Sequence, residues 1–166
     1  IPLKGNMEMT DINFIILVNK IRPFTPKFQV DALGRLWRSE EKEAAWEIAT
    51  RLVAIFDSMP KTYQTNKIPE DDKTVWLHYF YGGSDWYIIE KDKGNGPSDQ
   101  LQQQAFGYAI LDEDHINAEW GYISIEEIKE TGKIELDFYF EPVAFVLSSF
   151  VIISFTFISL RYEFCC

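Results

Sequence analysis

The 166-residue chain has the length of one ordinary domain, and its composition argues against two broad classes of protein. Apolar residues make up 46% and aromatic residues 16%, which is enough for a core and excludes intrinsic disorder over most of the length. Sixteen Lys and Arg against 26 Asp and Glu give a formal net charge of −10, which repels nucleic-acid phosphates. We therefore expect no direct nucleic-acid binding. The same charge would attract a basic protein, or a nucleic-acid-binding protein whose cleft normally holds phosphates.

Cysteine usage indicates a reducing compartment. Cys165 and Cys166 are the only cysteines, so no disulfide framework and no cysteine-based zinc site can be drawn. The apolar run Ile12–Val18 is too short and too interrupted for a signal peptide. We expect a cytoplasmic protein.

The first third of the chain changes character at Ser39. Residues 10–37 combine the apolar run Phe14–Val18 with Pro23 and Pro26, which predicts a short helix or strand followed by a loop. We assign residues 1–38 to an N-terminal extension and loop. From Ser39 onward, apolar residues recur every three or four positions up to Pro60, which predicts a helix over about 40–58.

Short aromatic and β-branched runs follow an acidic, proline-containing loop at 60–74. We predict strands at 75–81, 86–90, 105–111 and 120–123, with a hairpin turn at 82–85. Ser124 and Glu127 have capping-box spacing, so a short helix is expected over about 124–131, ended by Gly132.

Segment 133–140 alternates strictly, which is typical of a half-buried antiparallel strand. Its buried residues would be Ile134, Leu136, Phe138 and Phe140, and its solvent-facing residues Lys133, Glu135 and Asp137. The whole pattern predicts an α+β fold with a mostly antiparallel sheet, as a single domain over residues 39–142. Gly107 and Gly121 lie among aromatics inside strands, so we expect close packing or a bulge to require both.

Four blocks, in this order, carry a family resemblance: 85–92 (DWYIIEKD), 105–111 (AFGYAIL), 117–124 (NAEWGYIS) and 134–137 (IELD). Over about residues 75–141 they resemble the domain-of-unknown-function 2958 family, found in plasmids, phages and large proteins of mobile elements. The resemblance implies a mobile-element setting and supplies no catalytic residues. The chain departs from the family pattern after Pro142.

Paired carboxylates are the first kind of candidate site. Glu90 and Asp92, like Glu135 and Asp137, are spaced so that a strand places both on one face, where they could bind a metal or act as acid and base. His78 and His115 are the only imidazoles that could join them. A solvated outer face of a strand explains the same spacing, so we assign no metal and no cofactor. The hydrolase, zincin and dinucleotide motifs are absent.

Aromatic residues are the second kind, because Trp and Tyr combine apolar area with a polar group. Most of them are expected to pack the sheet and one or two to stay exposed. The binding residues that we select are Trp86, Glu90, Asp92, Tyr108, Glu119, Trp120, Tyr122 and Asp137.

The tail at 143–166 is apolar, and its residues 143–160 carry no charge. Three interpretations stay open: added strands, a membrane anchor through 143–160, or a non-native extension. Because the strand pattern and the family resemblance are complete by Pro142, we expect residues 1–142 to fold without the tail.

Three functions remain as hypotheses. The first is a non-enzymatic binding or regulatory module of a mobile element, acting through an acidic and aromatic surface on a protein partner. The second is a small metal-dependent hydrolase or nuclease that uses Glu90, Asp92, Glu119, Asp137 and a histidine. The third is a DNA-mimicking inhibitor of a host defence nuclease, whose carboxylates imitate phosphate spacing.

Overall fold

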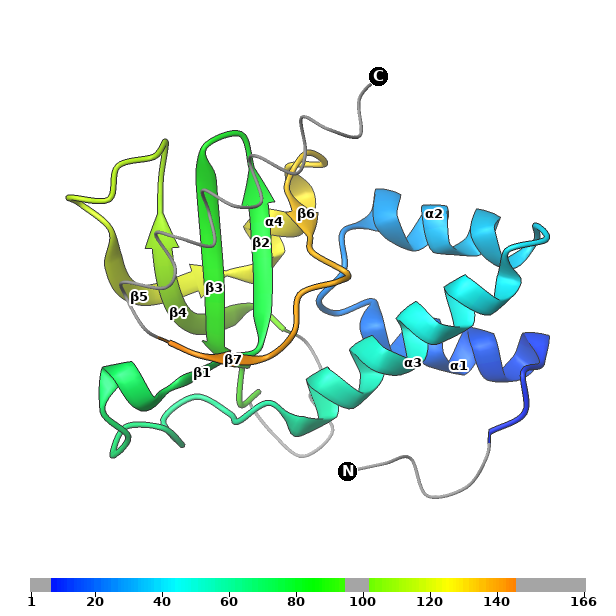
Figure 1. The fold of residues 1–166 in the computed structure, drawn as a ribbon, viewed down its shortest axis with the longest axis horizontal. Coiled ribbons are helices and arrows are strands. Elements are labelled where there is room, and N and C mark those ends of the chain that lie inside the picture. The colour runs from blue at the N-terminus through cyan, green and yellow to red at the C-terminus, as the bar shows by residue number, and fades with distance from the viewer. Residues whose placement is uncertain (1–6, 95–101, 146–166) are drawn as a thin grey trace.

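The computed structural model describes residues 7–94 and 102–145. Three helices lie beside the β2–β6 edge of an antiparallel sheet, and a fourth, short helix lies behind the sheet (Figure 1). The predicted α+β class with a mostly antiparallel sheet is therefore confirmed.

The main sheet has five strands in the order β5-β4-β3-β2-β6, all antiparallel. Its strands are β2 (Leu77–Tyr81), β3 (Ser84–Glu90), β4 (Gln104–Ile110), β5 (Glu119–Ser124) and β6 (Glu135–Leu136). The predicted hairpin is confirmed, since Tyr81 pairs with Ser84 across a two-residue turn in which Gly82 has φ +56°. A bulge between Ile88 and Glu90 shifts the β3–β4 register.

The N-terminal region corrects one prediction, because its expected loop is a helix. α1 (Asp11–Ile21) is capped by Thr10, whose hydroxyl accepts from the Asn13 amide, and α2 (Lys27–Trp37) begins directly after Pro26. A proline at the start of a helix loses no hydrogen bond, because that N–H has no partner inside the helix. Pro23 and Pro26, from which a loop was predicted, therefore lie between two helices, α1 and α2.

The predicted helices at 40–58 and 124–131 are confirmed as α3 (Lys42–Ser58) and α4 (Ile125–Glu130). The Ser124 hydroxyl accepts from the Glu127 amide, as the capping box predicted. A main core between the helices and one face of the sheet includes Phe14, Leu17 and Leu33 from α1 and α2. Residues 11–37 therefore share the core of the domain that was predicted to begin at 39.

The segment predicted as a strand over 133–140 is a strand only at β6. Ile134 and Leu136 are buried and Lys133 and Glu135 exposed, as expected. After β6 the chain turns, so that Phe138 and Phe140 are only half-buried. The Gln29 side chain completes the outer edge of β6 by donating to the Leu136 carbonyl (2.9 Å) and accepting from its amide (2.8 Å). An amide side chain thus takes the place of a further strand.

The start of the tail belongs to the fold. β7 (Val143–Ala144) pairs with β1 (Thr74–Val75), and the Phe145 amide donates to the Lys73 carbonyl (2.6 Å). Phe145 is fully buried in a second core on the other sheet face, so the fold is not complete at Pro142 as predicted. The rest of the tail, 146–166, lies outside the described residues. Among those described, no helix is long and apolar enough to cross a membrane.

Only one of the two strand glycines is required by packing. A Cβ on Gly107 would lie 2.1 Å from the Tyr87 carbonyl oxygen of β3, next to the bulge, whereas a Cβ on Gly121 would meet nothing within 4 Å. The expectation for Gly121 is therefore corrected. The open space beside it means that close packing does not select glycine there.

We predict that Gly107→Ala lowers the free energy of unfolding by about 2 kcal/mol or more, because a backbone carbonyl cannot move aside for the new methyl group. Gly121→Ala should change it by less than about 0.5 kcal/mol. Urea unfolding of both variants and the wild type measures the difference. Equal losses at the two positions would contradict the packing argument.

Candidate functional site

The sheet face turned away from the helices is aromatic. We call the side chains Phe106, Tyr108, Trp120 and Tyr122 of β4 and β5, together with Tyr87 of β3, the aromatic face. Because side chains alternate along a strand, every second residue of β4 and β5 points to this side. The Trp120 ring centroid lies 5.9 Å from that of Phe106 and 5.4 Å from that of Tyr108. These contacts are within the range of favourable aromatic pairs and fix the strand side chains in place.

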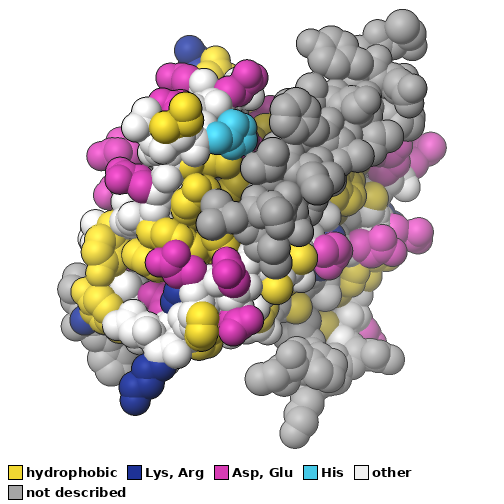
Figure 2. All heavy atoms as spheres, turned by 60° about the vertical axis from the view of Figure 1, so that its left-hand side comes forward, with side chains coloured by type: hydrophobic (Ala, Val, Ile, Leu, Met, Phe, Trp, Pro, Cys, Tyr) yellow, Lys and Arg dark blue, Asp and Glu magenta, His cyan; other side chains and the backbone are white. Residues whose placement is uncertain are grey.

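Two exposed tyrosines lie together here, Tyr122 of the aromatic face and Tyr63 of a neighbouring loop. Tyr122 is 51% exposed and Tyr63, in the loop before β1, is 53% exposed. The neighbouring Tyr63 hydroxyl raises the pKa of Tyr122. Tyr122 also packs edge-on against Phe106, with ring centroids 5.7 Å apart. Acidic side chains lie among hydrophobic ones on this side of the molecule (Figure 2).

The backbone of Tyr63 is strained, with φ at 77°. A bulky residue in the left-handed region costs about 1–3 kcal/mol and persists only where its surroundings impose it. Glu90 imposes it here. One carboxylate oxygen accepts from the Tyr63 amide (2.8 Å), and the other accepts from the Thr65 amide (2.6 Å) and hydroxyl (2.5 Å).

Lys73 completes this network under the loop. Its ammonium donates to the Thr65 carbonyl (2.6 Å) and hydroxyl (3.0 Å). Glu90, only 2% exposed, is thus surrounded by donors, as a buried carboxylate must be. Its role in the structure is to hold the 63–65 loop. The loop in turn places Tyr63 next to Tyr122.

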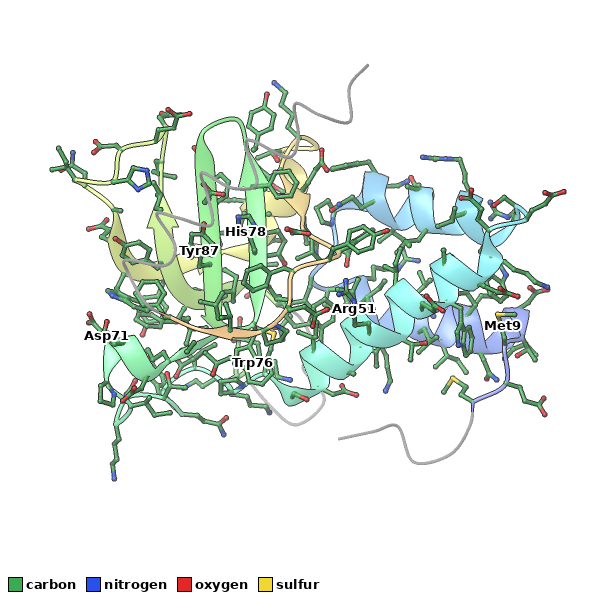
Figure 3. All side chains as sticks on the ribbon, viewed as in Figure 1. Met9, Arg51, Asp71, Trp76, His78 and Tyr87 are labelled. Carbon is green, nitrogen blue, oxygen red and sulfur yellow. The ribbon has the colours of Figure 1, made fainter. Side chains whose placement is uncertain are left out.

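His78 is the centre of a second polar cluster on the same side of the sheet. Its Nε2 lies 2.7 Å from Asp85 Oδ1, and its Nδ1 lies 3.5 Å from Asp137 Oδ2. The imidazole stacks on Tyr87 with centroids 4.8 Å apart, and the two residues are neighbours on β2 and β3 (Figure 3). Phe80 and Phe140 contact the ring as well, at 5.6 Å each. The cluster ties the β2–β3 hairpin to the turn after β6.

The charge state of His78 follows from these neighbours. Burial alone would lower its pKa, but the hydrogen bonds and charges of Asp137 and Asp85 outweigh burial and raise it. An imidazolium can donate to a carboxylate from each nitrogen, whereas a neutral ring has only one donor. Because both nitrogens face carboxylates, the ring has no lone pair directed at a substrate. The arrangement therefore suits a structural ion cluster better than a general base.

The structure does not assemble the eight predicted binding residues into one site. Tyr108, Trp120 and Tyr122 meet on the aromatic face, and Asp137 contacts His78. Trp86 packs against the main core on the opposite face, and exposed Glu119 also points to that side of β5.

Each paired-carboxylate prediction separates into two different roles. Glu90 is buried under the 63–65 loop, whereas Asp92 accepts from the amides of Gly94, Gln103 and Gln104. Glu135 is exposed, but Asp137, predicted to face solvent, has a side chain only 14% exposed because it turns toward His78. Within residues 7–94 and 102–145, no group of three or more His, Cys, Asp or Glu has the geometry to hold a metal ion.

Sequence reasoning missed Tyr63 and the partners of His78. Nothing in the polar loop at 60–74 indicated that Tyr63 would take up a left-handed backbone, because Glu90 that imposes it lies far along the chain. The His78–Asp85 contact did have a signal. A two-residue hairpin turn at 82–83 places these residues diagonally across β2 and β3 on one face.

Comparison with protein-family models, with curated proteins and with solved structures found no significant match to this chain. The resemblance to the domain-of-unknown-function 2958 family therefore stays a prediction.

We predict that Glu90→Gln lowers the free energy of unfolding by about 1–3 kcal/mol, because an amide nitrogen would face donors that now bind a carboxylate oxygen. Glu119→Gln, a matched change at an exposed strand position, should be within about 0.5 kcal/mol of the wild type. Urea unfolding gives both values. A stable Glu90→Gln protein that unfolds like the wild type would show that the 63–65 loop does not depend on this carboxylate.

The raised pKa of His78 predicts how stability changes with pH. The stabilisation is complete below the unfolded value of about 6.5 and is lost as pH rises through the raised folded pKa. The wild-type free energy of unfolding should therefore fall above pH 6.5, by at most about 1.4 kcal/mol per pH unit. His78→Gln should remove this slope. NMR titration of the imidazole provides an independent check, and a wild-type slope equal to that of His78→Gln would refute the assignment.

Proposed function

We propose that the chain is a non-enzymatic binding or regulatory module that acts on a protein partner through its acidic and aromatic surface. The observation that supports this most is the pair Tyr63 and Tyr122. The backbone of Tyr63 is strained, and this strained conformation places its exposed aromatic side chain beside that of Tyr122. Exposed tyrosines backed by a rigid stack are typical anchors of protein interfaces, because they add large area at small entropic cost.

The chemistry of the partner follows from charge. With a formal net charge of −10, the protein attracts basic surfaces and repels phosphate backbones. A basic protein, or a nucleic-acid-binding protein with its cleft empty, is the favoured partner. Direct binding to nucleic acid is disfavoured for the same reason.

An enzymatic function has less support from the geometry. The hydrolase hypothesis needs several carboxylates and a histidine in one cleft. Instead, Glu90 binds the 63–65 loop, Asp92 binds the start of β4, and His78 has a carboxylate at each nitrogen. The resemblance to a family of plasmid, phage and mobile-element proteins suggests the setting in which a regulatory module of this kind would act.

The test is affinity capture from the native host with three immobilised proteins: wild type, a double variant and a control. The double variant is Tyr63→Asn with Tyr122→Thr, since Asn tolerates the left-handed backbone and Thr suits a strand. The control is Tyr81→Thr, a comparably exposed tyrosine at the tip of the β2–β3 hairpin. We expect a protein that wild type and control retain and the double variant loses, with retention weakening as salt increases.

Equal retention by all three proteins would contradict the proposal. So would metal-dependent cleavage of single- or double-stranded DNA by the wild type that is lost in Asp137→Asn, since this result would favour the hydrolase or nuclease instead. The unfolding midpoints of all these proteins are compared before either outcome is interpreted.

A further inference from the structure

A groove separates α1 from α2 on the side of the molecule formed by the helices. Its volume is about 810 Å³, and Phe14, Ile15, Val18, Val30 and Trp37 provide its apolar lining. The Phe14 and Trp37 rings stack with centroids 4.2 Å apart, and the Trp37 indole donates to Asp11 (2.8 Å). The groove floor is therefore built from fixed side chains.

The first observation about this groove is that α1 is apolar on two sides. Phe14, Leu17 and Ile21 are buried against the core. On the other side Ile12, Ile15 and Ile16 are 72%, 57% and 43% exposed. Ile15 lines the groove, and Ile12 and Ile16 lie on the adjoining surface of the same helix. A cluster of exposed isoleucines at helical spacing marks a contact surface.

The second observation is the charge around the groove. Residues 7–38 contain five Lys and Arg against three Asp and Glu, a net +2, although the whole chain is at −10. Arg22, Arg35 and Arg38 line the groove, and none of them forms a salt bridge with any residue that the structure describes. Two carboxylates line the groove as well: Asp31 pairs with Lys27, and Asp11 accepts a hydrogen bond from Trp37. The three arginines therefore leave the groove lining with a net positive charge.

The third observation is Gly34, which lies inside α2 and lines the groove. A Cβ at this position would meet nothing within 4 Å, so packing within the described residues does not require glycine. Glycine inside a helix is less favourable than alanine, because it loses more backbone freedom on folding. Because Gly34 has no side chain, the groove is unobstructed at this position.

From these three observations we propose that the α1–α2 groove binds an acidic amphipathic helix of a partner protein. The apolar anchors of that helix would pack on Ile15, Val18 and Trp37. Its Asp and Glu side chains would pair with Arg22, Arg35 and Arg38. A planar guanidinium group can bind a carboxylate in a bidentate manner, through two parallel hydrogen bonds. This site is separate from the aromatic face and is positively charged within a chain of formal net charge −10, so it selects a different partner.

The probe is a fluorescently labelled peptide of about 14 residues, or four helical turns, with Leu at positions i, i+3, i+4 and i+7 and Glu at most others. Two controls accompany it: the same composition in scrambled order, and the same pattern with Lys in place of Glu. Fluorescence anisotropy with the full chain measures binding. We expect the acidic amphipathic peptide to bind at least tenfold more tightly than either control, and less tightly as salt increases.

Two variants test the location. Gly34→Leu fills the groove from a position with open space, and should weaken binding at least tenfold without lowering the unfolding midpoint. Arg38→Glu should weaken binding similarly and provides a second test that does not depend on filling the groove. The matched controls are Gly121→Leu, at another glycine with open space, and Lys67→Glu, at an exposed loop residue. Both should bind the peptide as the wild type does.

The proposal fails if Gly34→Leu and Arg38→Glu both bind like the wild type, or if the scrambled peptide binds equally well. It also fails if the wild type does not bind the peptide but binds vesicles containing phosphatidylglycerol. That result would identify Ile12, Ile15 and Ile16 as a membrane contact. Concentration-dependent dimerisation abolished by Gly34→Leu, in the absence of peptide binding, would identify a second copy as the occupant. None of these results bears on Tyr63 and Tyr122, so the two surfaces are tested independently.

Discussion

Much of the aromatic side of this protein depends on one buried carboxylate. A charge removed from water has to be surrounded by hydrogen-bond donors, and Glu90 finds them in the backbone of residues 63 and 65. That requirement draws the loop onto the end of the sheet and forces Tyr63 into a backbone conformation it would not adopt alone. The bulge beside Glu90 in β3 and the absent side chain at Gly107 belong to the same region. A polar constraint in the interior thus determines what is presented at the surface.

The His78 cluster is a second case in which a buried ionisable group needs polar partners, here an imidazole between two carboxylates. Its two carboxylates come from β3 and from the turn after β6, so a single imidazole links segments that are distant in sequence. Such a cluster stabilises one arrangement of the hairpin and the turn, because leaving any member unpaired would be costly. The same engagement of both nitrogens leaves the His78 ring without a lone pair for proton transfer.

The fold separates two surfaces of different character. The sheet side presents tyrosines, with acidic side chains among the hydrophobic ones, and the helices present isoleucines and arginines around a groove. Because the main core joins the helices to the sheet, the two surfaces belong to one packed unit. A module with two such surfaces could bring together two partners of opposite charge, which is how a regulatory or adaptor protein acts without chemistry of its own.

By itself the sequence determined the fold class, the helices at α3 and α4, the β2–β3 hairpin and the strands β4 and β5, because each of these has a local signal in its periodicity or turn residues. It also selected Tyr108, Trp120 and Tyr122 as binding candidates, and the structure brings these three together on β4 and β5. Only the tertiary structure decided that α2 begins directly after Pro26 and that Phe145 belongs to the core. Only the structure, too, showed that Glu90 supports a loop and that Asp137 turns toward His78. The physical reason is the same in each case: a buried or charged group is satisfied by whichever partner the fold brings near it, and that partner can lie far away along the chain.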